Sequence, residues 1–145
     1  MIYLDTAFLA KLYFREHGSE EVRELVGSFD AVACSAHGRV ELAYVFHRKL
    51  REGSIDRKGL VARMNLIELD TSKGLISWLP LDSSLLDAAF ASVLKLQRKT
   101  PLRAADALHL VSARENGFTK IYSNDRHLIA GTRHFGLKGI NVVPD

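Results

Sequence analysis

Several features are scarce or missing in this sequence of 145 residues, and each absence excludes a class of protein. The chain has one cysteine, Cys34, so it can form neither an internal disulfide nor a zinc site built on several cysteines. No stretch approaches the roughly 20 apolar residues of a membrane-spanning helix. The N-terminal residues also lack the basic and long apolar segments of a signal peptide. We therefore expect a cytoplasmic protein that does not enter a membrane.

Proline is also rare, with three residues, and the sequence contains no low-complexity stretch or internal repeat. A chain of this length can build one hydrophobic core but not two comfortable ones. We therefore expect a single domain over residues 1–145. The sequence has no Walker loop and no dinucleotide fingerprint, which argues against enzymes that use a nucleotide cofactor.

The charges nearly balance, with 20 basic and 17 acidic residues and a net charge of +3. This excess alone is a weak indication of a nucleic-acid partner. Four of the acids stand out below as candidate cation ligands. The other 13 acids leave the rest of the molecule with a charge of +7, which would attract a polyanion.

Short apolar runs alternate along the chain with segments of helical periodicity. We expect strands at residues 2–4, 31–34, 75–79, 120–123 and 140–143. The helices expected between them include one capped by Thr6, one over roughly 36–51 capped by Ser35, one from Asp82 to about 97, and one from Thr100 and Pro101 to 116–117. Strands separated by helices predict crossover connections. The fold class is therefore α/β, with a central parallel sheet of about five strands and helices on both faces.

Four acids lie at positions where this fold would either place them at a ligand site or bury them at a cost in free energy. Asp5 and Asp125 each follow an expected strand, and ligands of open α/β sheets bind beyond the carboxyl ends of the strands. Glu41 and Asp106 lie in helices among apolar neighbours. Burying a lone carboxylate there would cost several kcal/mol or raise its pKa until it is neutral.

Carboxylates that converge on one place repel each other, and a divalent cation removes that conflict. A set of oxygen ligands suits Mg²⁺ or Mn²⁺ better than zinc. Such a cation fits the hydrolysis of a phosphodiester. Each acid also has a plainer explanation, because Asp5 and Asp125 could form turns or helix caps and Glu41 could pair with a base at the surface. Asp106 is the hardest to explain in this way, and spacing alone does not show that the four acids converge.

Four segments resemble the acidic motifs of PIN domains, in the same order and on the same elements. They are Ile-Tyr-Leu-Asp5-Thr6, Ser35 with Val-Glu41-Leu-Ala, Leu-Arg-Ala-Ala-Asp106-Ala-Leu-His-Leu, and Tyr-Ser123-Asn-Asp125. The third segment is the most specific, and the resemblance spans almost the whole chain. A PIN domain of this length is similar to the VapC-type toxins of prokaryotic toxin–antitoxin pairs.

This resemblance implies a strand order of 3-2-1-4-5, which would place Asp5 and Asp125 side by side. It also implies a Mg²⁺- or Mn²⁺-dependent endoribonuclease that acts on RNA, forms a homodimer and is inhibited by a cognate antitoxin. The implied metal ligands, direct or through water, are Asp5, Glu41, Asp106 and Asp125. Thr6 and Ser123 match small hydroxyl positions that would position a water or a carboxylate.

Several neighbouring residues have two interpretations that the sequence leaves open. Arg103 could pair with an acid or contact a phosphate. Arg126 and Arg133 could form a rim that contacts RNA phosphates, or lie in a solvated loop. For His109 we favour packing in the helix over metal binding.

Two other functions remain open at this stage. One is a PIN-like module that binds RNA or a protein and cleaves nothing. The other is a metal-dependent phosphatase or deoxyribonuclease on a similar sheet.

Overall fold

The computed structural model describes residues 1–144, within which five short strands form the centre of the molecule. Their bounds are β1 (Ile2–Tyr3), β2 (Val32–Ser35), β3 (Ile76–Leu79), β4 (Lys120–Tyr122) and β5 (Lys138–Ile140). All the strand pairs are parallel: β1 with β2, β2 with β3, and β4 with β5. A parallel bridge between Leu4 and Tyr122 joins the two sets. The strand order is therefore 3-2-1-4-5, which confirms the predicted α/β fold.

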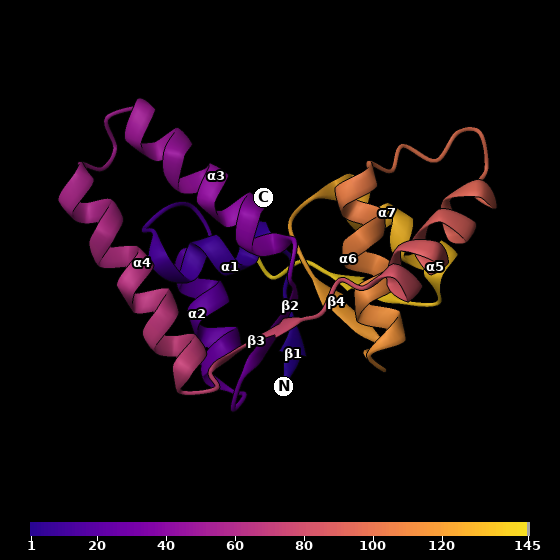
Figure 1. The fold of residues 1–145 in the computed structure, drawn as a ribbon, viewed down its shortest axis with the longest axis horizontal. Helices are drawn as coiled ribbons and strands as arrows, with labels where there is room; N and C mark the ends of the chain where they lie inside the picture. The colour runs from indigo at the N-terminus through magenta and orange to yellow at the C-terminus, as the bar shows by residue number, and fades with distance from the viewer. Residues whose placement is uncertain (145) are drawn as a thin grey trace.

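Helices cover both faces of the strands (Figure 1). One side carries α1 (Thr6–Tyr13), α2 (Ser19–Gly27), α3 (Gly38–Arg51) and α4 (Arg57–Ser72). The other side carries α5 (Ser83–Leu94), α6 (Ala104–Glu115) and α7 (Arg126–Gly131), and a 3₁₀ turn over Thr132–Phe135 follows α7. Among residues 1–144, no helix combines the length and the apolar composition needed to cross a bilayer.

The core consists of two apolar clusters, one on each side of the strands. Ile2 and Leu4 pack in the cluster beneath α1 to α3, whereas Tyr3 packs with Leu110 and Ile121 on the side of α5 and α6. This alternation follows from the period of two along a strand. Because both faces are covered, the strands read in the sequence as continuous apolar runs.

The start of α1 differs from the prediction, and the difference bears on the site. Asp5, not Thr6, caps the helix, because its Oδ1 accepts a hydrogen bond of 2.8 Å from the Phe8 N–H. Thr6 is the first residue of the helix, so its hydroxyl is available for another partner.

The predicted caps at Ser35 and Thr100 are also wrong. Ser35 pairs with Leu79 inside the sheet, and α3 begins only at Gly38, after a turn. The helix predicted from Thr100 and Pro101 begins at Ala104. The Asp106 carboxylate, at the third position of that helix, accepts a hydrogen bond from the Arg103 N–H and so does part of the capping.

The last strand lies earlier than predicted, at Lys138–Ile140 instead of 140–143. Ile140 ends the pairing with β4, and Val143 packs into the core beside Gly18. The apolar character of Val143 therefore reflects burial outside the sheet. Helix α5 is likewise shorter than predicted, because it ends at Leu94.

Candidate functional site

A pocket of about 180 Å³ lies where β1 and β4 end side by side. The structure brings all four acids that were singled out from the sequence to this pocket. Its lining includes Asp5, Glu41, Asp106 and Asp125, together with Thr6, Arg103 and His109. The acids come from the end of β1, from α3, from α6 and from the residue that caps α7.

Asp5 lies deepest, and only 4% of its surface is exposed. Its Oδ1 accepts from the Phe8 N–H, and its Oδ2 accepts a hydrogen bond of 2.5 Å from the Ser123 hydroxyl. Burial raises the pKa of Asp5 above its usual value, although the Ser123 hydrogen bond opposes this rise. A buried carboxylate of this kind gains by binding a cation.

Glu41 lies in the first turn of α3, which approaches α1 closely. A Cβ atom at Gly38 would lie 2.7 Å from Cys34 Sγ and 2.9 Å from Thr6 Oγ1, so only glycine fits this approach. Glu41 Oε2 accepts a hydrogen bond of 2.5 Å from the Thr6 hydroxyl and lies 3.0 Å from His109 Nε2. Burial alone would raise the pKa of Glu41, but the bonds from His109 and Thr6 lower it to about 2. Glu41 is therefore ionised at neutral pH.

Arg103 links the remaining two acids. Its Nε donates to Asp106 Oδ2 at 3.1 Å, and its guanidinium also donates to Asp125. Asp125 additionally accepts from the backbone N–H groups of His127 and Leu128. Burial raises the pKa of Asp125, but these N–H groups and Arg103 lower it overall. Of the two roles left open for Arg103, the structure shows the pairing with acids.

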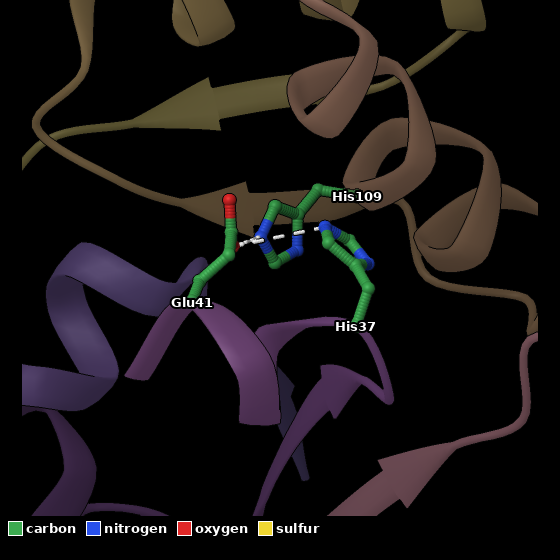
Figure 2. A group of neighbouring side chains, drawn as sticks. All are labelled: His37, Glu41 and His109. Atoms are coloured by element: carbon green, nitrogen blue, oxygen red, sulfur yellow. Dashed lines mark hydrogen bonds and ion pairs between the residues drawn. The ribbon is translucent and has the colours of Figure 1, made fainter. Parts of the chain in front are cut away.

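Two histidines flank Glu41, and sequence reasoning missed one of them (Figure 2). His109 is 3% exposed, and its Nδ1 lies 2.9 Å from the Tyr3 hydroxyl, as befits a packed residue. His37 comes from the turn before α3, and its Nε2 lies 3.7 Å from Glu41 Oε2. Burial lowers the pKa of His37 to about 4. The available signal was the spacing of four residues between His37 and Glu41, which places both on one side of a helix.

The other predicted contact residues lie outside this pocket. Arg126 and Arg133 are exposed, and neither contributes to the pocket lining. A larger groove of about 650 Å³ shares Thr6, Glu41 and Arg103 with the pocket. It extends between α1 and α3 toward basic residues, Lys11 and Arg48.

The donor set of the pocket fits a hard divalent cation. Its acids offer carboxylate oxygens, which Mg²⁺ and Mn²⁺ prefer. Within residues 1–144, however, the tightest group of three potential ligands is His37, Glu41 and His109, and no three of the four acids lie as close together. This spacing fits a cation that keeps several water ligands and contacts some carboxylates through them, as Mg²⁺ commonly does.

Comparisons with known proteins identify the family of this chain. Residues 2–132 match the sequence model of the PIN domain. The chain belongs to the PIN-domain family. This PIN domain is 32% identical over 143 residues to Ribonuclease VapC47 of Mycobacterium tuberculosis (strain CDC 1551 / Oshkosh), covering 94% of this chain and 93% of the relative. It is thus a homologue of a VapC ribonuclease.

Solved structures show the same fold at lower sequence identity. VapC20 of Mycobacterium tuberculosis, described as a toxin that cleaves the sarcin–ricin loop, superposes with a TM-score of 0.69 at 20% identity, covering 90% of this chain and 95% of VapC20. A chain of VapBC2 from Rickettsia felis, bound to a DNA fragment from their promoter, superposes with a TM-score of 0.65 at 18% identity, covering 97% and 98%.

Proposed function

We propose that this PIN domain is an endoribonuclease that hydrolyses RNA phosphodiester bonds with the help of Mg²⁺ or Mn²⁺. The observation that carries the metal dependence is the convergence of four acids on one pocket. The homology to Ribonuclease VapC47 supports RNA as the substrate. Asp5, Glu41, Asp106 and Asp125 are the candidate ligands.

The surrounding residues hold these acids in place. Ser123 binds Asp5 through its hydroxyl and accepts a hydrogen bond of 2.8 Å from the Asp125 N–H, so it ties two acids together. The Thr6 hydroxyl likewise donates a hydrogen bond to the Glu41 carboxylate. These two hydroxyls position carboxylates, which is one of the roles expected for them. Because these hydroxyls already fix the carboxylates, the acids lose less conformational entropy when a cation or substrate binds.

A bound cation would lower the pKa of a water and offset the charge that builds on a phosphoryl group. The residues of this chain hold the four acids in position around the cation. Arg103 now pairs with Asp106 and Asp125, and if these two acids held a cation, the Arg103 guanidinium would be available to bind a phosphate.

The groove between α1 and α3 is the proposed path of the RNA backbone. It joins the acid pocket at Thr6, Glu41 and Arg103 and leads to Lys11 and Arg48. Arg48 is exposed along this path and would attract phosphates without reading sequence, whereas the Lys11 ammonium is buried and paired with Glu16. Arg126 and Arg133, which are exposed beyond the pocket, remain candidates for further phosphate contacts.

We also propose that the chain is the toxin of a toxin–antitoxin pair and forms a homodimer. Large apolar side chains are exposed outside this groove, which favours a covered surface in the assembled protein. They include Val61, Leu66 and Leu69 on α4, and Phe90 and Leu94 on α5. Light scattering of the purified chain, with and without a co-expressed antitoxin, measures both assemblies.

The test is cleavage of a structured RNA pool by the purified chain, with Mn²⁺ or with EDTA. Asp106→Asn should fold, as judged by circular dichroism, and lose cleavage by at least about 100-fold, the usual effect of removing one electrostatic contributor. Asp87→Asn is the matched control, because Asp87 is exposed on α5 and outside the pocket. Full activity in folded Asp106→Asn would refute the assignment.

The same assay separates the alternative functions. A module that only binds RNA would bind the pool and leave it intact in Mn²⁺. A deoxyribonuclease or phosphatase would cleave DNA or a phosphomonoester in preference to RNA in a parallel substrate panel.

A further inference from the structure

The two histidines beside Glu41 form a second candidate metal centre with different chemistry. His37 Nε2, Glu41 Oε2 and His109 Nε2 face one another, and the ligand atoms of this group all lie within 4.8 Å (Figure 2). Among residues 1–144 this is the only such group of three. It contains two imidazoles and one carboxylate, whereas the acids of the pocket offer oxygen alone.

Both imidazoles are oriented from behind by hydroxyl groups. His37 Nδ1 lies 2.8 Å from the Ser35 hydroxyl, and His109 Nδ1 lies 2.9 Å from the Tyr3 hydroxyl. A hydroxyl oxygen can accept from an Nδ1–H group, which leaves the Nε2 lone pair for a metal. The Tyr3 oxygen is itself fixed, because it accepts a hydrogen bond from the Ser35 N–H.

His37 Nε2 also lacks a partner of its own. It is buried and makes no hydrogen bond of good geometry within residues 1–144, although the Ala105 backbone lies near the imidazole, and its separation of 3.7 Å from Glu41 is too long for a hydrogen bond. A buried polar atom without a partner is uncommon and calls for an explanation such as an ion.

The spacing fits a tetrahedral ion. Ligands about 2.0 Å from zinc lie roughly 3.3 Å from one another, since the edge of a tetrahedron is about 1.6 times its radius. The two observed distances to Glu41 Oε2 are 3.0 Å from His109 and 3.7 Å from His37, on either side of that value. A zinc ion would replace the hydrogen between His109 and Glu41 and would also give His37 Nε2 a partner.

We propose that His37, Glu41 and His109 bind one Zn²⁺ ion, with a water or phosphate oxygen as the fourth ligand. Two imidazoles and a carboxylate form a set that transition metals favour over Mg²⁺. Glu41 belongs to both centres and His109 also lines the acid pocket, so Zn²⁺ would draw Glu41 away from the other three acids. The resulting inhibition of cleavage rests on the proposed function, whereas the binding of zinc does not.

The experiment measures metal binding directly, using the full chain freed of metal. Zn²⁺ affinity is obtained by competition with a chromophoric chelator, and Co²⁺ serves as a spectroscopic probe of the ligand geometry. The wild type should bind one Zn²⁺ per chain, and Co²⁺ should give the intense visible bands of a four- or five-coordinate site.

His37→Gln should weaken Zn²⁺ binding by at least about tenfold and abolish the cobalt bands, because one ligand is lost. His47→Gln is the matched control: it makes the same substitution on α3, outside the cluster. Asp106→Asn should keep Zn²⁺ binding while losing cleavage, so the two hypotheses fail separately. The proposal is overturned if the wild type binds no Zn²⁺, if His37→Gln binds as well as His47→Gln, or if Asp106→Asn removes the site.

Discussion

Ser123 and Ser112 are both fully buried serines, and the structure predicts opposite consequences when each is changed to alanine. The Ser123 hydroxyl donates to the Asp5 carboxylate and accepts from the Asp125 N–H. The Ser112 hydroxyl, on α6, makes no hydrogen bond of good geometry among residues 1–144, although it lies close enough to the Tyr3 hydroxyl to act on the pKa of Tyr3. The pair therefore separates the value of the hydrogen bonds from the effect of removing an oxygen atom from the interior.

The magnitude for Ser123→Ala follows from the two bonds. A hydrogen bond to a charged group contributes about 1.5–3 kcal/mol, and the Asp125 N–H left without this acceptor adds about 1 kcal/mol. The free energy of unfolding should therefore fall by about 2.5–4 kcal/mol. Ser112→Ala removes only a weak contact with the Tyr3 hydroxyl, so stability should stay within about 0.5 kcal/mol.

Urea denaturation in EDTA measures both variants, with the slope of the unfolding free energy against urea as a check that both unfold from the same state. Equal losses in the two variants would show that the Ser123 contacts do not hold the acids. A loss below about 1 kcal/mol in Ser123→Ala alone would show the same.

Two further predictions concern the charges of the site. Arg103→Gln should tighten Mn²⁺ binding a few-fold in calorimetry, because the guanidinium that competes for Asp106 and Asp125 is removed; its exposed ion pairs are worth only about 0–1 kcal/mol each. Weaker Mn²⁺ binding would contradict this competition. The second prediction concerns His37. Burial lowers the pKa of His37 to about 4 in the folded chain, whereas in the unfolded chain this pKa is near the ordinary value of 6.5. The unfolded chain therefore takes up a proton at a higher pH than the folded chain does. The unfolding free energy of the wild type should therefore fall as pH drops from about 6.5 to about 4, and it should fall less in His37→Gln. Urea titrations across that range measure the difference, and parallel pH profiles would refute the buried, neutral state of His37.

The sequence was sufficient to predict the strands and the acids that follow them. Ile2–Tyr3 and Lys120–Tyr122 are apolar enough to be recognised as buried strands, and a parallel sheet places their carboxyl ends together. This placed Asp5 and Asp125 at the same edge of the sheet, and the strand order implied by the family resemblance made them neighbours. Glu41 and Asp106 stood out because their helical neighbours are apolar, and the family resemblance grouped them with Asp5 and Asp125 as metal ligands.

Capping was less predictable, because several residues compete for each role. Ser35 has the composition of a cap, yet it completes β2 and supports His37 through its hydroxyl. Thr100 is followed by a proline, but α6 starts later, where Asp106 accepts from the Arg103 N–H. Tertiary pairing and a later acid prevailed over local propensity in these cases.

The histidine cluster could not be predicted from spacing alone. His37 and Glu41 are four residues apart, but His109 comes from a helix on the other side of the strands. Only the folded chain shows that the Nε2 atoms of both histidines face the same carboxylate oxygen.

The central claim is that the four acids form one site for a divalent cation. Anomalous diffraction from crystals soaked in Mn²⁺, and in Zn²⁺ as a separate experiment, tests it most directly. The account predicts a manganese peak in the pocket lined by Asp5, Glu41, Asp106 and Asp125, with coordination distances of about 2.2 Å to at least one carboxylate. A manganese peak elsewhere, or none in a crystal whose pocket is open to solvent, would contradict it.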